Sequence, residues 1–187
     1  GVTNSPRIAE RRQATRGEIL AAAWDLAHEH GLAGLSLRAL GTRVGMRAQS
    51  LYGYFASKND IYDAMFADGY RTLLAEVAWP GADDPVDRES FKAETRAFVA
   101  FCVADAVRYQ LLFQRTLPGF EPSAESYALA LEVLVEVDLL GRHALRLHDP
   151  LHAGIAQQAR DDRARLRRVA GPVDDGAESG SVPFELL

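Results

Sequence analysis

The chain has 187 residues, of which 48% are hydrophobic and 25% charged, a composition typical of a soluble globular protein with a real core. Its single cysteine, Cys102, excludes an internal disulfide, and no apolar run approaches the roughly 20 residues that a membrane helix needs. No signal peptide precedes the first charged residues, so we expect a cytoplasmic protein with no membrane partner. Ala and Leu are abundant, which favours helices over sheets.

Charge is distributed unevenly along the chain, whose net charge is −5. Residues 1–58 hold eight basic and four acidic side chains, a net charge of +4, whereas the remaining residues carry −9. A basic N-terminal part on an acidic body indicates that only the N-terminal part meets a polyanionic partner. The alternative is an ordinary scatter of surface charge.

The N-terminal part predicts a flexible arm followed by a helix. Residues 1–14 are polar and contain Pro6. Thr15 stands three residues before Glu18, so each side chain can bond the other's free backbone N–H in a capping box. Apolar residues then recur at helical spacing as far as Gly31, which we expect to end the helix.

Two short helices joined by a tight turn are predicted next. Ser36 caps the first of them and Gly45 ends it. The segment 47–55 (RAQSLYGYF) would be the second, although it is too short to be stable alone. Leu51 and Phe55 are four residues apart, so we expect them to pack this segment onto the preceding helices. This pattern is typical of a helix-turn-helix.

The remainder predicts a helical body. Ser57 and Asp60 form a capping pair at the start of a fourth helix. This helix leads out of the N-terminal helix-turn-helix part, residues 15–60, which we call the head. Further helical regions are expected over about 88–116, 123–147 and 150–169. We therefore expect an all-α fold with a flexible arm (1–14), a helix-turn-helix domain (15–60), a helical C-terminal domain (61–170) and a disordered tail (171–187).

The polar face of segment 47–55 suits the major groove of B-DNA, which is about 12 Å wide and admits one helix. Arg47 and Gln49 are expected to read bases, because Arg can bond guanine and Gln can bond adenine through two hydrogen bonds each. The residues suited to phosphate contact are Ser36, Arg38, Ser50, Tyr52 and Lys58. The alternatives are that Ser36 acts only as a helix cap, Tyr52 only packs and Arg47 is a solvated charge.

Residues 19–64 closely resemble the DNA-binding domain of TetR-family transcriptional regulators. The run is ILAAAWDLAHEHGLAGLSLRALGTRVGMRAQSLYGYFASKNDIYDA. The matching positions are Ile19-Leu20, Gly31, Leu35-Ser36-Leu37-Arg38, Val44-Gly45-Met46, Ser50-Leu51-Tyr52, Tyr54-Phe55 and Ser57-Lys58. The resemblance implies an all-helical homodimer whose N-terminal three-helix domain binds palindromic operators on double-stranded DNA. It implies a larger C-terminal domain that dimerises and binds a small molecule, and mostly a repressor that the ligand releases from DNA.

The resemblance also assigns roles by position. Base reading falls to Arg47, Ala48, Gln49 and Ser50. Contact with the DNA backbone falls to Ser36, Arg38, Tyr52, Tyr54 and Lys58, and the position of Tyr54 sometimes contacts a base.

The chain departs from the family pattern in two places. Gly41 stands where the family usually has Ala, and a glycine inside a helix costs about 1 kcal/mol, so we expect a looser helix with the same role. After residue 150 the family has two apolar closing helices that form its dimer, whereas this chain turns Arg-rich after Gln158. Either the last helix is truncated or the dimer uses other surfaces.

A ligand pocket in such a fold would lie between long helices and be lined by apolar and aromatic side chains, which suits an apolar or aromatic effector. The candidates are Phe98, Cys102, Tyr109, Phe113, Phe120 and Tyr127, and the alternative for each is an ordinary core position. We find no glycine-rich phosphate loop, metal-ligand cluster or catalytic constellation in the sequence, so we expect no enzyme, no metal and no cofactor. The rival function is a helix-turn-helix protein that organises DNA or binds partners without a small-molecule ligand.

Overall fold

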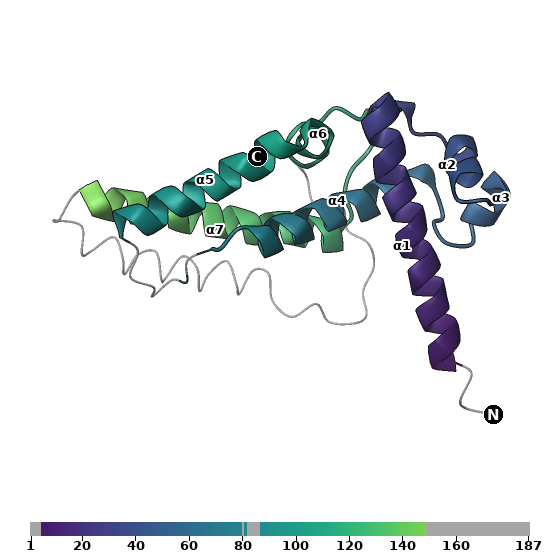
Figure 1. The fold of residues 1–187 in the computed structure, drawn as a ribbon, viewed down its shortest axis with the longest axis horizontal. Coiled ribbons are helices and arrows are strands. Elements are labelled where there is room, and N and C mark those ends of the chain that lie inside the picture. Colours follow the sequence, from purple (N-terminus) through teal and green to yellow (C-terminus); the bar gives the residue numbers. More distant parts are fainter. Residues whose placement is uncertain (1–4, 80, 82–86, 149–187) are drawn as a thin grey trace. The chain divides into compact units, whose positions relative to one another are not determined.

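The computed structural model describes residues 5–79, 81 and 87–148, and every regular element within them is a helix (Figure 1). In chain order they are α1 (Ser5–His30), the 3-10 turn η1 (Leu32–Gly34), α2 (Leu37–Arg43), α3 (Ala48–Leu51), α4 (Lys58–Glu76), α5 (Arg88–Ala104), α6 (Ala106–Phe113) and α7 (Ala124–His148). The expected all-α fold is confirmed for this part of the chain. The helix predicted at 150–169 and the tail at 171–187 lie outside the described residues.

The chain divides into two compact units. The first combines residues 1–69 with 105–126, and the second combines 70–104 with 127–187. Helices α4 and α7 each contribute to both units. The division into a DNA-binding and a regulatory domain is a functional one and stays a prediction. None of the helices described is long and apolar enough to cross a membrane.

Helix α1 is longer than predicted. It begins at Ser5, so the expected flexible arm is helical from that residue onward, and Thr15 lies inside the helix instead of capping it. The reason is that Pro6 suits a first helical turn, where its missing N–H bonds nothing and its fixed φ already fits. The following RIAERRQA consists mostly of strong helix formers and contains no glycine.

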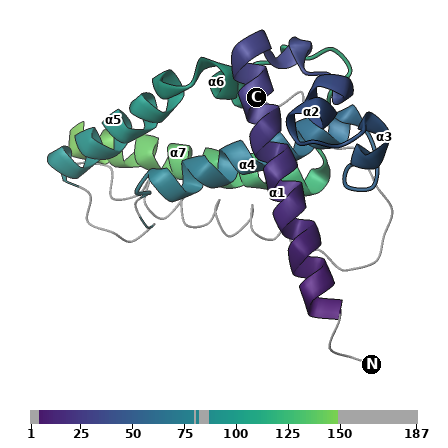
Figure 2. The same cartoon turned by 45° about the vertical axis from the view of Figure 1, so that its right-hand side comes forward.

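Helices α1, α2 and α3 and the start of α4 enclose the core of the first unit. Helix α2 packs against α1, and α3 packs against α2 (Figures 1 and 2). The fully buried side chains here include Ile19, Leu35, Leu40, Leu51, Ile61, Met65 and Phe66. The hydroxyl of Tyr62 donates to the carbonyl of Leu32 at 2.6 Å, so the polar atom of this buried ring is satisfied. This core gives the short helices α2 and α3 the tertiary support that they lack alone.

The turn between α2 and α3 is a Schellman motif. The N–H of Met46 donates to the carbonyl of Gly41 at 2.8 Å, and the N–H of Gly45 donates to the carbonyl of Thr42 at 3.3 Å. Gly45 has φ 68, the left-handed conformation that this motif requires. A Cβ added at Gly41 would lie 2.6 Å from the carbonyl oxygen of Met46. Gly41 therefore lets the turn approach α2 more closely than an alanine would.

Helix α6 completes the first unit. It packs closely on α4, since a Cβ added at Gly69 would lie 2.9 Å from Leu112 Cδ2. The expected helical region 88–116 is interrupted at Asp105, whose carboxylate accepts the N–H of Arg108 at 2.9 Å and caps α6. Aspartate favours this capping position over the helix interior. Asp105 also bonds Nε2 of His28 at 2.8 Å, which links α6 to the end of α1.

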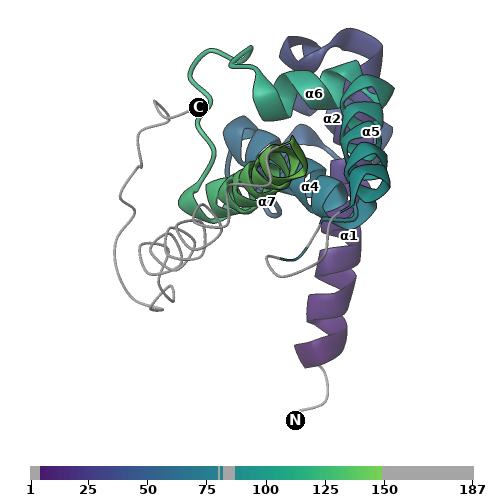
Figure 3. The same cartoon turned by 90° about the vertical axis from the view of Figure 1, so that its left-hand side faces the viewer.

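The second unit contains the end of α4, helix α5 and most of α7 (Figure 3). The rings of Trp79 and Phe98 meet edge to face at 6.0 Å between centroids. Tyr70 is buried, and burial raises the pKa of its hydroxyl, with smaller contributions from Tyr127 and Cys102. The second unit thus gathers aromatic side chains from three helices and the segment that follows α4.

Candidate nucleic-acid interface

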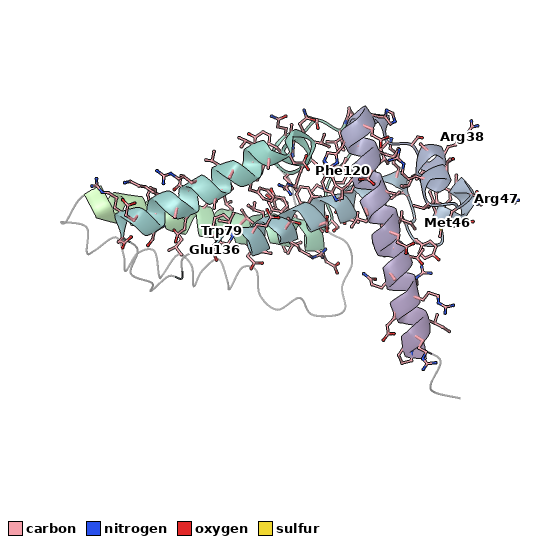
Figure 4. The ribbon with its side chains drawn as sticks, in the orientation of Figure 1. Arg38, Met46, Arg47, Trp79, Phe120 and Glu136 are labelled. Atoms are coloured by element: carbon pink, nitrogen blue, oxygen red, sulfur yellow. The ribbon has the colours of Figure 1, made fainter. Side chains whose placement is uncertain are left out.

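The outer side of α2 and α3 carries the polar side chains predicted for DNA contact. Ser36, Arg38, Arg47, Gln49, Ser50 and Tyr52 are all exposed, while Ala48, Tyr54 and Lys58 are partly buried. Figure 4 shows the side chains of Arg38 and Arg47 pointing away from α1. The structure therefore brings the nine predicted residues onto elements of one unit, with the expected base readers at its surface.

The helix that carries the base readers is held from behind. Leu51 is 1% exposed and Phe55 3%, which confirms the prediction that these two side chains anchor the segment. The helix is shorter than the predicted 47–55, because only Ala48–Leu51 is α-helical. Beyond it the N–H groups of Tyr54 and Phe55 both donate to the carbonyl of Leu51, at 2.8 and 2.9 Å. Gly53, a poor helix former, lies where the helix has ended.

Arg47 occupies the N-cap position of α3. Its backbone is extended, with φ −70 and ψ 145, and its side chain makes no capping hydrogen bond. Capping therefore does not occupy its guanidinium.

Ser36 and Ser57 act as helix caps. The Oγ of Ser36 accepts the N–H of Ala39 at 3.1 Å, and the Oγ of Ser57 accepts the N–H of Asp60 at 3.1 Å. The predicted capping role of Ser36 is therefore confirmed. Phosphate contact would be a second role for its hydroxyl.

Not every arginine of the head is available to a partner. Both terminal nitrogens of Arg43 donate to the carboxylate of Glu29, at 2.7 and 2.6 Å. This hydrogen bonding lowers the pKa of Glu29 and raises that of Arg43. The bidentate pair neutralises one of the eight basic side chains counted in residues 1–58.

Two residues outside the predicted set contact the turn that follows α3. The guanidinium of Arg12 donates to the carbonyl oxygen of Gly53, and that of Arg16 donates to the carbonyl oxygen of Tyr54. Neither was predicted from the sequence: Arg12 was assigned to a flexible arm, and Arg16, although inside the predicted helix, was counted only as a positive charge. Their spacing of four residues, which places them on one face of a continuous helix, is the signal that would have found them.

The predicted ligand-pocket residues are divided between the two units. Phe98, Cys102 and Tyr127 belong to the second unit, and Tyr109, Phe113 and Phe120 to the first. Phe120 packs against Tyr62 and Phe66, with ring centroids 5.8 and 6.3 Å apart, as a core residue would. Tyr109 and Phe113 pair at 5.3 Å and are both partly exposed.

Within the second unit two further aromatic residues join the predicted set. The charges of Tyr127 and Cys102 add to the effect of burial on the pKa of Tyr70, and Trp79 packs on Phe98. Neither was predicted from the sequence, because an aromatic residue in a helical run carries no signal that distinguishes a pocket from a core. These side chains are candidates for a ligand site in this unit, and an ordinary core is the alternative for each.

Comparison with known proteins identifies the N-terminal part. Residues 19–65 match the family described as bacterial regulatory proteins, tetR family. The HTH-type transcriptional regulator Rv1816 of Mycobacterium tuberculosis is 31% identical over 120 residues, which cover 61% of this chain and 51% of that protein. The HTH-type transcriptional activator FasR of Mycolicibacterium smegmatis is 25% identical over 179 residues, which cover 92% of this chain and 82% of the activator.

One solved structure is similar to this chain in both fold and sequence. The crystal structure of the regulatory protein SCO4313 superposes with a TM-score of 0.56 and 27% sequence identity, covering 68% of this chain and 61% of the other. The chain spans about half the length of the relative from M. tuberculosis. The matched helix-turn-helix segment, the relatives and the all-helical fold show that residues 19–65 are similar to the DNA-binding part of the tetR family of bacterial regulatory proteins, and that the chain is similar to transcriptional regulators beyond this segment.

Proposed function

We propose that this protein is a transcriptional regulator that binds a specific DNA sequence through α3. The observation that carries the proposal is the contrast between the two sides of this helix. Leu51 and Phe55 are buried, while Arg47, Gln49 and Ser50 face outward. A short helix held in this way can place its polar side in the major groove, where side chains distinguish all four base pairs.

The proposed contacts follow from exposure and chemistry. Arg47 and Gln49 would bond base edges, with Ala48 and Ser50 close to the same bases. Backbone contacts would come from Ser36, Arg38, Tyr52, Tyr54 and Lys58, which fix the position of α3 on the duplex without reading sequence. The similarity to the tetR family supports a homodimer, whose two copies of α3 would meet half-sites about 34–36 Å apart on a palindromic operator.

We further propose a small apolar or aromatic effector that binds in the second unit. The residues assigned to it are Tyr70, Trp79, Phe98, Cys102 and Tyr127. Helix α4 begins in the first unit and ends in the second, so it is a covalent path from this group to the DNA-binding head. An effector that binds one arrangement of the second unit more tightly than another would shift the equilibrium between the two arrangements, and with it the conformation of the head. An effector with equal affinity for the two arrangements would not shift this equilibrium.

Release of a repressor from DNA is the proposed mode of control. Activation is the second candidate, because the relative FasR is named a transcriptional activator and is similar to 92% of this chain. Transcription in vitro from a promoter that carries the operator separates the two modes. A repressor lowers transcript yield and the effector restores it, whereas an activator raises the yield.

Selection of bound fragments from random DNA tests the proposed function directly. We expect a palindromic consensus whose affinity exceeds that of random duplex by about 10³-fold or more. Weak binding with no sequence preference and a steep dependence on salt would instead support the DNA-organising alternative. Effector screening would then use the selected operator as its probe.

A further inference from the structure

Helix α1 reaches the turn that ends the recognition segment. The Nη2 group of Arg12 donates to the carbonyl of Gly53, and its Cζ lies 5.2 Å from the centroid of the Tyr54 ring. The Nη1 group of Arg16 donates to the carbonyl of Tyr54, and its Cζ lies 4.0 Å from the centroid of the Phe55 ring. Two arginines one helical turn apart thus hold two consecutive carbonyls and two aromatic rings.

These contacts lie where the recognition segment is weakest. Helix α3 has only four residues, so few of its carbonyl groups have a partner within the helix. The carbonyls of Gly53 and Tyr54 lie beyond its end, where a cation is favourable. Hydrogen bonds from a charged donor are roughly twice as strong as neutral ones. Arg12 and Arg16 therefore stabilise the part of the segment that has no regular structure of its own.

Apolar packing and these hydrogen bonds constrain different motions. Burial of Leu51 and Phe55 holds the segment on the core, but the hydrophobic effect has no direction and permits small rotations. Hydrogen bonds weaken steeply when bent, so bonds to two successive carbonyls orient the two peptide planes next to Tyr54. The direction in which α3 presents its side chains depends on that orientation.

We propose that Arg12 and Arg16 are positioning residues for sequence recognition. By fixing the turn after α3 from the side of α1, they aim Arg47 and Gln49 at base edges without contacting bases themselves. This inference rests on the proposed function and adds a determinant of specificity on α1, outside the helices α2 and α3. It also assigns a purpose to the N-terminal extension of α1, because Arg12 reaches Gly53 only if residues before Thr15 are helical.

The test compares Arg16→Ala and Arg12→Ala with Arg11→Ala in the full chain. Arg11 is exposed on the same helix, and its replacement by alanine removes one positive charge, as the other two replacements do. Arg16→Lys keeps the charge and one donor and should rescue part of the effect. Two measurements are made: amide hydrogen exchange of residues 48–55 in the free protein, and the dissociation constants for the selected operator and for a random duplex across a range of salt.

We expect Arg16→Ala to speed exchange in residues 48–55 and to weaken operator binding about tenfold, the loss of roughly one charged hydrogen bond. Binding of the random duplex and the salt slope should stay as in the wild type. Arg12→Ala should also speed exchange in residues 48–55 and weaken operator binding. If circular dichroism shows that Arg16→Ala does not fold, the test is made with Arg12→Ala. Arg11→Ala should leave exchange in residues 48–55 unchanged.

Two results would overturn the inference. Equal weakening of both duplexes with a salt slope reduced by about 1 would mean that the arginines contact phosphate directly. Unchanged exchange in residues 48–55 for both alanine variants would mean that the arginines do not position the turn. If the wild-type protein prefers no DNA sequence, the proposed function fails, whereas the exchange comparison still decides whether the turn is held from α1.

Discussion

Two arginines of the head show how residues of one type acquire different roles. Arg43 lies at the end of α2, and its guanidinium forms a bidentate pair with the carboxylate of Glu29. Arg47 lies four residues later, at the N-cap of α3. Its side chain is exposed and makes no capping hydrogen bond. The two residues carry the same charge in the sequence, but the guanidinium of Arg43 is bound to a carboxylate whereas that of Arg47 is exposed, so Arg47 is the one that we propose for contact with a base edge.

The first prediction concerns the base readers. Arg47→Ala and Gln49→Ala should each weaken operator binding by about 1–3 kcal/mol and relax preference at individual base pairs, since each removes a two-bond contact. The measurement is the dissociation constant for a set of single-base operator variants. Arg43→Ala is the matched control and should leave the preference at every position unchanged. A uniform loss across all variants would show that Arg47 is a phosphate contact.

The second prediction concerns Lys58, whose Nζ lies 5.4 Å from the centroid of the Tyr62 ring. Lys58→Ala should weaken operator and random duplex alike, because a phosphate contact carries no sequence information. The slope of log affinity against log salt should fall by about 1. Titrations of both duplexes at several salt concentrations measure this. A loss confined to the operator would contradict the assignment.

At the scale of elements, glycine and aspartate decide where helices meet and end. Gly41 was expected to loosen α2, yet it is buried at the closest approach of the Schellman turn. Asp105 separates α5 from α6 and connects α6 to His28 of α1. Gly41 matters because of a carbonyl across the turn, and Asp105 matters in part because of a histidine on another helix. Intrinsic helix propensity describes a residue within its own helix, so it predicts neither effect.

The third prediction is that Gly41→Ala destabilises the protein. Propensity alone would give a gain of about 1 kcal/mol, but the new Cβ would lie 2.6 Å from the Met46 carbonyl oxygen. Backbone must move to relieve this contact, and overpacking of this kind costs about 1–3 kcal/mol. We expect a net decrease in the free energy of unfolding, measured by urea denaturation. Gly17→Ala, at an exposed helical site with nothing within 4 Å, is the control and should stabilise.

The fourth prediction concerns the cap of α6. Burial raises the pKa of Asp105, but hydrogen bonds from the Arg108 N–H and from His28 outweigh it, so the pKa lies below its ordinary value of 3.8. A carboxylate with a lowered pKa stabilises the fold above its unfolded pKa, and this contribution is lost as pH falls through the folded pKa. Asp105→Ala should therefore lower the free energy of unfolding by about 1 kcal/mol at neutral pH.

Denaturation of the wild type and of Asp105→Ala between neutral pH and pH 3 checks this sign. The difference between the two proteins should shrink only at the acidic end of the range. A difference that disappeared well before this acidic end would contradict a lowered pKa at Asp105.

At the scale of the whole molecule, two units share two helices. Helix α4 links the DNA-binding head to the second unit, and α7 begins in the first unit where Ser123 and Ser126 bond the carboxylate of Asp63 at 2.9 and 2.8 Å. A change in the second unit therefore has continuous helices through which it can reach the head. This arrangement supports the proposed coupling between effector and operator.

The fifth prediction tests that coupling. Cys102→Leu adds volume among the side chains proposed for the effector site and should reduce the response of operator binding to an effector, while operator affinity without effector stays near that of the wild type. Val103→Leu is the control, because Val103 is 75% exposed. Fluorescence of Trp79 in a Trp24→Phe background reports effector binding independently of DNA. An unchanged effector response in Cys102→Leu would exclude Cys102 from the effector site.

The sequence by itself determined the helical character, the helix-turn-helix and the inward position of Leu51 and Phe55. These properties follow from short-range patterns: caps at Ser36 and Ser57, a glycine at 45 and apolar residues four apart. Local patterns also placed the outward polar residues correctly, because in a short amphipathic segment burying one side exposes the other.

Only the tertiary structure decided how α3 is held and which charges remain available. The bonds from Arg12 and Arg16 to the turn span 41 and 38 residues, and the pair of Arg43 with Glu29 spans 14. Gly41 likewise matters through a carbonyl across the turn. Such contacts depend on how helices cross, and helix crossing is set by the fit of the whole core rather than by any local run of residues.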